Sequence, residues 1–217
     1  MTFRERLRAL PTFARPGLPP FDPDAAPSTP HELFVAWLDE AIEAELLAAH
    51  AATLSTADAA GHVHARTLLL KDVTADGWWF ASQSTSPKGR DLAANPHAAL
   101  TFFWPGLGRQ VKVTGSAAPA SPEASRADFL ARPDVSRAAG LVNHQSEPLA
   151  SPQEYDQAFA EALRAVSADP QLAAPDWTAY VVAPTEVEFW QAPDDGPHTR
   201  LLYRAGADGW ITGLLWP

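Results

Sequence analysis

The chain has 217 residues, a formal net charge of −10 and no cysteine. This negative charge argues against a nucleic-acid partner, because contact with a phosphate backbone requires a basic face. Without cysteine there is no disulfide, thiolate metal site or cysteine nucleophile. The apolar fraction of 46% is typical of a globular protein, no apolar run is long enough to cross a bilayer, and the N-terminus lacks the apolar core of a secretory signal. The sequence therefore predicts a cytoplasmic protein with no membrane partner.

Residues 1–30 are predicted to form an arm, because seven prolines fall between Pro11 and Pro30. Proline removes a backbone donor and disfavours helix at the residue before it, so the arm is expected to be extended. The sequence leaves open whether it is a mobile tail or a strap over a partner surface. Residues 31–217 are predicted to be the folded domain, which opens with a helix capped by Thr29 and started by Pro30.

The rest of the chain reads mainly as strands joined by hairpins. Strands are expected at 52–56, 63–71, 78–82, 98–104, 109–117, 178–182, 186–191, 200–203 and 210–214, with Asp76-Gly77 closing a hairpin between the second and third. Helices are expected from Ser86 to Asn95 and at 121–131, 136–142 and 152–168. This order predicts a mainly β protein with peripheral helices (α+β), built on an antiparallel barrel. Dinucleotide-binding and P-loop glycine motifs are absent from the sequence.

One stretch, Arg66 to Ser116, concentrates basic and amide side chains in an otherwise acidic protein: Arg66, Lys71, Lys88, Arg90, Arg109 and Gln110. Lys88 falls in the first turn of the helix that begins after Ser86, where unpaired N–H groups and the helix dipole suit a phosphate. The stretch thus predicts a site for a small phosphorylated molecule. Read locally, the same residues also fit solvated charges on a helix and at strand edges.

Other polar residues suggest a planar ligand and no metal. His62 and His64 lie on one strand face, but no third ligand accompanies them, so no metal site is predicted. Trp190, His198 and Arg200 bring an aromatic ring, an imidazole and a guanidinium to one loop, where they could line a planar molecule. Acid–base residues in known arrangements are scarce, so an enzyme built on this chain would rely on a cofactor.

Several short motifs, some of them named above, occur together in an order that is typical of one protein family. They are Arg66-Thr67-Leu68-Leu69-Leu70-Lys71, Lys88-Gly89-Arg90, Gly108-Arg109-Gln110-Val111, Arg132-Pro133 with Ser136, Gln145-Ser146, and Glu188-Phe189-Trp190-Gln191 with His198 and Arg200. From about Leu33 to Pro217 the chain resembles the pyridoxamine 5′-phosphate oxidase family. That resemblance implies an antiparallel split β-barrel, FMN as cofactor, and a homodimer whose dimerisation region is C-terminal.

The resemblance also implies roles for individual residues, with the FMN phosphate held by Arg66, Ser82 and Lys88. The implied cofactor-binding residues are Arg66, Thr67, Leu68, Leu69, Leu70, Lys71, Ala81, Ser82, Lys88, Gln110, Gln145, Ser146, Trp190 and Arg200. The implied substrate-binding residues are Lys71, Arg132, Ser136 and His198, and His198 is also the implied catalytic residue.

The implied reaction oxidises pyridoxine or pyridoxamine 5′-phosphate to pyridoxal 5′-phosphate, while molecular oxygen is reduced to hydrogen peroxide. Three positions depart from the family pattern. Pro87 and Gly196 stand where the family commonly has arginines, and Asp128 replaces a tyrosine that touches the substrate phosphate. Two alternatives therefore stay open: an FMN oxidase for another, phenazine-like aromatic substrate, and a flavin-binding protein without turnover.

Overall fold

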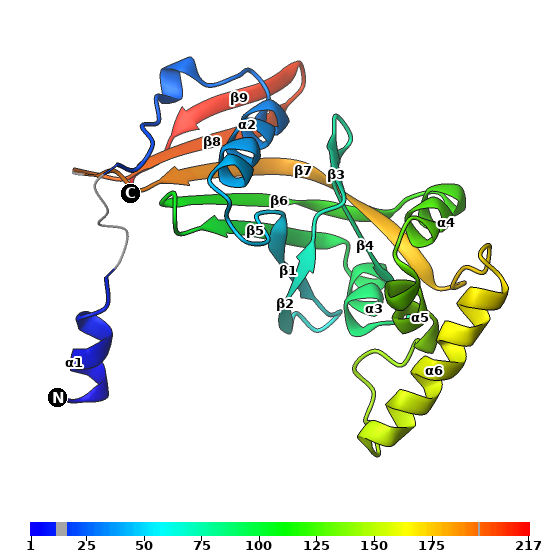
Figure 1. Ribbon diagram of the computed structural model, residues 1–217. Helices are drawn as coiled ribbons and strands as arrows, with labels where there is room; N and C mark the ends of the chain where they lie inside the picture. Colours follow the sequence, from blue (N-terminus) through cyan, green and yellow to red (C-terminus); the bar gives the residue numbers. More distant parts are fainter. Residues whose placement is uncertain (12–16, 195) are drawn as a thin grey trace. The chain divides into compact units, whose positions relative to one another are not determined.

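The computed structural model describes residues 1–11, 17–194 and 196–217 (Figure 1). The described chain divides into two compact units. The first comprises Met1–Ala52, Leu100–Val113 and Thr185–Pro217, and the second comprises Thr53–Ala99 and Thr114–Pro184. No helix in the described ranges has the length and apolar character that a bilayer crossing demands.

The strands form one hydrogen-bonded sheet. Its members in the described chain are β1 (Ala51–Ala57), β2 (Val63–Leu69), β3 (Asp72–Thr74), β4 (Gly77–Gln83), β5 (His97–Trp104), β6 (Arg109–Pro119), β7 (Trp177–Gln191), β8 (Thr199–Gly206) and β9 (Gly209–Leu214). The order is β2-β1-β5-β6-β7-β4-β3, with β8 on β7 and β9 on β8. The pairs β3–β4, β4–β7, β7–β8 and β8–β9 are antiparallel. The predicted antiparallel β architecture with peripheral helices is confirmed.

Two strand predictions need correction. The hairpin at Asp76-Gly77 joins the short strand β3 to β4, whereas β2 pairs with β1 at the other end of the sheet order. Gly77 has φ +140°, and a Cβ there would meet the Val182 carbonyl oxygen at 2.1 Å, so only glycine fits this turn. The two strands expected at 178–182 and 186–191 are one continuous strand, β7, although Pro184 removes a backbone donor.

The N-terminal arm holds more structure than the prolines predict. Helix α1 (Phe3–Arg8) begins with a capping box between Thr2 and Glu5, and a 3₁₀ turn, η1, follows at Pro23–Ala25. Residues 12–16 of the predicted arm lie outside the described residues. Further along, the backbone N–H groups of Gly17 and Leu18 donate to Asp194 at 2.7 and 2.8 Å. This part of the arm is therefore bonded to the chain's own first unit, while the boundary between arm and domain at residue 30 stays a prediction.

Aromatic side chains form the core of the first unit. Helix α2 (Pro30–Glu43) buries Phe34 and Trp37. Phe34 packs edge-on to Phe102 of β5 with ring centroids 4.7 Å apart, and Trp37 packs on Phe189 of β7 at 5.2 Å. Such pairs contribute stability beyond the burial of their area.

A buried cation, Arg109, belongs to this core. Its guanidinium lies 4.3 Å from the Trp37 ring centroid, its Nε donates to Gln191 at 2.7 Å, and its NH1 donates to Glu40 at 2.8 Å. Only 2% of the residue is exposed. Arg109 thus stabilises the fold of the first unit and does not join the basic site that the stretch 66–116 suggests.

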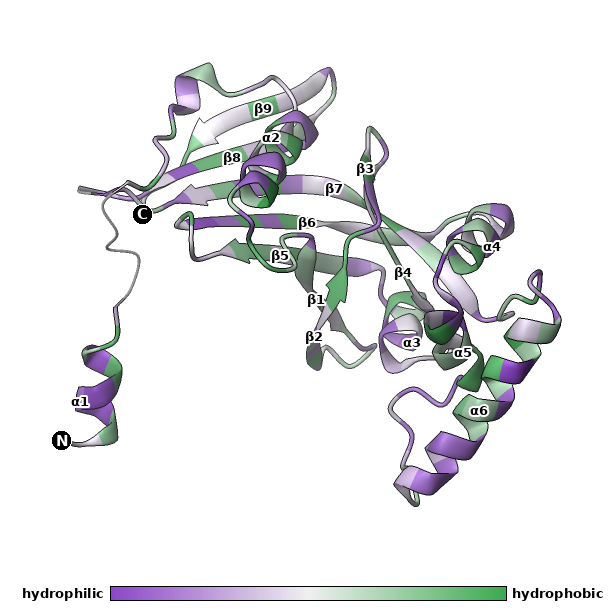
Figure 2. Cartoon of the chain, in the orientation of Figure 1, coloured by the Kyte–Doolittle hydropathy of each residue, from purple (hydrophilic) through white to green (hydrophobic). Residues whose placement is uncertain are grey.

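In the second unit, four helices accompany the sheet: α3 (Pro87–Ala94), α4 (Pro122–Leu130), α5 (Asp134–Val142) and α6 (Pro152–Ala168). Helix α5 packs against α6 (Figure 1), and α6 carries hydrophobic and hydrophilic residues along its whole length (Figure 2). Ser86 caps α3 by accepting from the Gly89 N–H, as predicted. A Cβ on Gly89 would lie 2.2 Å from the Ser84 carbonyl oxygen, so glycine allows the first turn of α3 to sit close to the end of β4.

We predict that Glu40→Ala lowers the free energy of unfolding by about 1.5–3 kcal/mol, the range for a hydrogen bond to a charged group. The substitution removes the carboxylate that compensates the buried Arg109 guanidinium. Asp39→Ala is the matched control, because Asp39 is exposed on the same helix, and its effect should stay within about 0.5 kcal/mol. Urea denaturation measures both, and equal losses would contradict a structural role for the Arg109–Glu40 pair.

Candidate functional site

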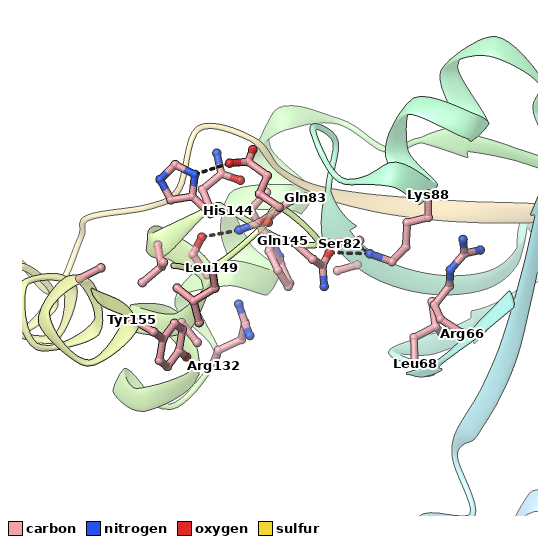
Figure 3. A pocket seen from close by; sticks show the side chains of 18 of the residues that line it. Arg66, Leu68, Ser82, Gln83, Lys88, Arg132, His144, Gln145, Leu149 and Tyr155 are labelled. Atoms are coloured by element: carbon pink, nitrogen blue, oxygen red, sulfur yellow. Dashed lines mark hydrogen bonds and ion pairs between the residues drawn. The ribbon is translucent and has the colours of Figure 1, made fainter. Parts of the chain in front are cut away.

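A cavity of about 780 Å³ lies within the second unit. Its lining comes from β2, β4, the start of α3, α5 with the segment that follows it, and α6, so that side chains far apart in the sequence converge (Figure 3). A volume of this size is typical of sites for cofactors and small molecules. Its cationic residues divide into two groups, and two carboxylates, Glu147 and Glu154, also line it.

The first group is Arg66 and Lys88, which lie at one end of the cavity beside Ser82 (Figure 3). Lys88 is 8% exposed, and its Nζ donates to Ser82 Oγ at 2.9 Å, Ser86 Oγ at 3.2 Å and Gln145 Oε1 at 2.6 Å. Burial, reinforced by the positive charge of Arg66, lowers the pKa of Lys88 to about 8. An ammonium surrounded by neutral oxygens and a second cation is stabilised by any anion that enters the cavity.

Arg66 is held at its guanidinium by β-strand acceptors. Its NH1 donates to Thr56 Oγ1 at 2.7 Å and to the carbonyl oxygens of Leu54 and His64, each at 3.2 Å. Burial lowers the pKa of Arg66, and the charge of Asp91 opposes that shift. The side chain still reaches the cavity, so its remaining N–H groups are available to a ligand.

The second group centres on Arg132, which Figure 3 shows beside Tyr155 and Leu149. The guanidinium carbon of Arg132 lies 4.0 Å from the Trp177 ring centroid, a cation–π contact. Its NH1 is buried with no hydrogen-bond partner among the described residues. A buried donor left without an acceptor is costly, so this nitrogen is suited to donate a hydrogen bond to an oxygen of a ligand.

A smaller cavity of about 230 Å³ is lined in part by Lys71 and Asp128. Asp128 Oδ1 lies 3.4 Å from Lys71 Nζ, and Asp128 Oδ2 accepts from Trp177 Nε1 at 2.8 Å. The carboxylate therefore compensates the charge of Lys71 and also holds the ring on which Arg132 stacks. Pro87, another departure from the family pattern, is simply the first residue of α3.

The structure brings together about half of the predicted site residues. The larger cavity is lined by Arg66, Thr67, Leu68, Ala81, Ser82, Lys88, Gln145 and Arg132 from the predicted sets. Lys71 lines the smaller cavity, whereas Leu69, Leu70, Ser136 and Ser146 belong to the second unit without being among the lining residues described. Arg90, from the same basic stretch, donates to the Thr85 carbonyl oxygen.

The remaining predicted residues, Gln110, Trp190, His198 and Arg200, belong to the first unit. Trp190 lies opposite Arg200 in the β7–β8 register, and its ring centroid is 4.7 Å from that of His198. Arg200 donates through Nε to the buried Glu188 at 2.8 Å. The aromatic, imidazole and guanidinium groups expected together at this loop are therefore neighbours.

Sequence reasoning missed several lining residues: Gln83, His144, Leu149, Tyr155, Ala158 and Trp177. The amphipathic pattern of α6 signals a buried face, but it does not say that this face borders a cavity. Within the described ranges no group of three or more His, Asp or Glu side chains is placed to hold a metal. His62 and His64 bond Asp58 and Asp91, at 2.9 and 3.0 Å.

Comparison with known proteins places this fold in a class. The crystal structure of PhzG from Burkholderia lata in complex with tetrahydrophenazine-1-carboxylic acid matches with a TM-score of 0.86 and 29% identity, over 93% of this chain and 98% of that one. A pyridoxamine 5′-phosphate oxidase-related, FMN binding protein from Nostoc punctiforme shares the fold, with a TM-score of 0.73 at 18% identity over 88% of this chain and all of that one (100%). The fold is therefore the antiparallel split barrel with peripheral helices, as the sequence predicts.

Sequence comparison then gives the family. The family model described as pyridoxamine 5′-phosphate oxidase matches residues 38–191, and the one described as pyridoxine 5′-phosphate oxidase C-terminal dimerisation region matches residues 177–217. Pyridoxine/pyridoxamine 5′-phosphate oxidase of Pseudomonas paraeruginosa is 39% identical over 88% of this chain and 90% of its own. The relative from Anaeromyxobacter dehalogenans is 39% identical over 91% of this chain and 100% of its own. The chain belongs to the pyridoxamine 5′-phosphate oxidase family, a family of oxidoreductases.

The lowered pKa of Lys88 gives a prediction about stability and pH. Between pH about 8 and 10.5, the unfolded chain keeps a Lys88 proton that the folded chain has lost, so the contribution of Lys88 to stability rises with pH. Lys88→Met removes this dependence. From pH 7 to pH 10 the ligand-free parent should gain roughly 1–3 kcal/mol in free energy of unfolding relative to the Lys88→Met variant. Urea denaturation at the two pH values measures it, and a difference independent of pH would show that Lys88 is not desolvated.

Proposed function

We propose that this chain is an FMN-dependent oxidase that converts pyridoxine or pyridoxamine 5′-phosphate to pyridoxal 5′-phosphate with molecular oxygen as acceptor. The observation that carries the proposal is a pair of cations, the buried Lys88 and the partly buried Arg66, at one end of a cavity of about 780 Å³. Curated relatives named pyridoxine/pyridoxamine 5′-phosphate oxidase, at 39% identity over most of the chain, support the reaction.

The donor set fits the phosphate of FMN. Arg66 offers a planar fork of N–H groups, Lys88 a charged ammonium and Ser82 a hydroxyl, and all three border the same end of the cavity. We assign the phosphate to these three residues and the adjoining part of the cofactor to Thr67, Leu68, Ala81 and Gln145. FMN, when bound, supplies the acceptor for a hydride and the means to pass electrons to oxygen. We also assign four further residues to contacts with FMN: Ser146, Gln110, Trp190 and Arg200.

The chain's own task in this reaction is to bind and orient. Arg132, with its unpaired buried NH1, and Lys71 supply positive charge for the anionic group of the substrate. We assign Ser136 and His198 to the substrate as well, with His198 in contact with the reacting part of the molecule. Holding two reactants in one geometry accounts for a large share of such rate enhancements, so no proton relay is required of the protein.

A second candidate function keeps FMN and changes the substrate to an aromatic carboxylic acid. Two observations favour it. The PhzG structure, at 29% identity, was determined with tetrahydrophenazine-1-carboxylic acid. In this chain the Asp128 carboxylate already neutralises Lys71. The positive charge that remains suits a carboxylate monoanion better than a phosphate dianion.

Assembly as a homodimer belongs to the proposal too, because residues 177–217 match a region described as a dimerisation region. The cytoplasmic location stays a prediction of the sequence. A third possibility, flavin binding without turnover, is an outcome of the experiments below.

We predict that Arg66→Ala and Lys88→Ala each weaken FMN binding by roughly ten- to a hundredfold, because each removes a positive charge beside the phosphate. Quenching of flavin fluorescence on titration with the ligand-free protein measures the dissociation constant. Riboflavin, which lacks the phosphate, should lose much less affinity. Arg90→Ala is the matched control, since Arg90 is an exposed cation on the same helix. A protein that binds neither flavin at millimolar concentration would refute the proposal.

The substrate is tested by turnover. We expect the FMN-loaded protein to release hydrogen peroxide and pyridoxal 5′-phosphate from pyridoxine or pyridoxamine 5′-phosphate. Asp128→Asn keeps an acceptor for Trp177 and removes the negative charge, so it should raise kcat/KM roughly tenfold for the phosphorylated substrates and less for their unphosphorylated forms. If FMN binds but neither phosphate yields peroxide, a dihydroaromatic carboxylic acid is tested next. A flavin that no candidate reduces anaerobically indicates a binding protein.

A further inference from the structure

Behind Arg66, away from the residues that line the cavity in the described chain, lies a buried polar pair, Thr56 of β1 and Asp91 of α3. Thr56 is 2% exposed and Asp91 is 6% exposed. Thr56 Oγ1 lies 2.6 Å from Asp91 Oδ2, and His64 Nδ1 reaches the same oxygen at 3.0 Å. Two buried polar groups in such close contact call for a role, because burying them has a cost that their own hydrogen bond only partly offsets.

The direction of the Thr56–Asp91 hydrogen bond follows from its partners. Burial raises the pKa of Asp91, but hydrogen bonds from Thr56 and His64, with the nearby charges of His64 and Arg66, outweigh it and lower the pKa overall. The carboxylate is therefore ionised at neutral pH and can only accept. A threonine hydroxyl has one hydrogen, so this hydrogen points to Asp91 and the oxygen turns its lone pairs elsewhere.

The lone pairs of Thr56 Oγ1 accept a hydrogen bond from Arg66. The NH1 of Arg66 donates to Thr56 Oγ1 at 2.7 Å, a shorter distance than the 3.2 Å to the carbonyl oxygens of Leu54 and His64. Arg66 NH2 lies 3.8 Å from Asp91 Oδ2, so the carboxylate also attracts the guanidinium directly. Because the guanidinium is planar and rigid, anchoring one nitrogen sets the direction of the whole fork.

We propose that Thr56 is a positioning residue for ligand phosphate: Asp91 sets the direction of its hydroxyl, and the hydroxyl holds Arg66 with its free N–H groups turned into the cavity. The inference rests on the proposed function, since it takes Arg66 to be a phosphate ligand. The inference goes beyond the cavity lining, because it makes phosphate affinity depend on Thr56, a neutral residue that does not contact the ligand.

Thr56→Val tests this with little change in shape and none in charge, and Thr56→Ser is the matched control because it keeps the hydroxyl. Dissociation constants for FMN and riboflavin are measured by fluorescence quenching on the ligand-free variants. We expect Thr56→Val to weaken FMN binding about tenfold and riboflavin binding less than about twofold, with Thr56→Ser close to the parent for both. In an Arg66→Ala background, Thr56→Val should have no further effect on FMN, since the group that it positions is gone.

Equal losses for FMN and riboflavin would overturn the inference, because they would mean that Thr56 only supports the fold. So would a full effect of Thr56→Val in the absence of Arg66. If Arg66→Ala alone leaves FMN affinity unchanged, it is the assignment of the phosphate site that fails, and the two failures are thereby distinguished.

Asp91→Leu provides a second test should the valine variant not fold, because leucine removes both the charge and the acceptor for the Thr56 hydroxyl. Removing a negative charge beside Arg66 would by Coulomb attraction alone tighten the binding of a phosphate, whereas loss of positioning weakens it. We expect weaker FMN binding with riboflavin binding unchanged. Tighter FMN binding would overturn the proposal.

Discussion

The site depends on keeping two cations charged in a place with little water. Lys88 and Arg66 are both desolvated, and their repulsion contributes to the lowered pKa of the lysine. Neutral oxygens of Ser82, Ser86 and Gln145 surround the ammonium. These acceptors satisfy its hydrogen bonds but do not cancel its charge, so the pair is destabilising until an anion arrives. The same imbalance that costs stability gives the cavity its affinity for a phosphorylated ligand.

Charge compensation separates this pair from the other buried cation of the basic stretch. Arg109 has a carboxylate, an amide and an indole ring as partners, and it stabilises the first unit. Lys88 has no carboxylate within hydrogen-bonding distance among the described residues, and Arg66 has one only at 3.8 Å. A buried cation whose charge is compensated by a carboxylate has a structural role, whereas a cation whose partners are mainly neutral can bind an anionic ligand.

Around Arg132 and the smaller cavity, the cations are compensated differently. Asp128 brings a carboxylate to Lys71 and, through Trp177, supports the ring under Arg132. Lys71 is thereby compensated, whereas the buried NH1 of Arg132 has no hydrogen-bond partner among the described residues. The two candidate substrates are therefore distinguished by the charge around Lys71 and Arg132, and not by the fold or by the residues assigned to FMN.

The family, the antiparallel architecture and most element positions could be predicted from the sequence, because they rest on signals within a few residues. Ser86 and Pro87 start α3, and the period of apolar residues gives α6 its bounds at 152 and 168. Three features emerge only in the folded chain: β3, and not β2, pairs with β4; Arg109 is structural; and Thr56 holds Arg66. Those outcomes depend on pairs such as Thr56 with Asp91 and Arg109 with Glu40, which are 35 and 69 positions apart. Burial and charge compensation arise from such distant pairs, and no local pattern of residues encodes them.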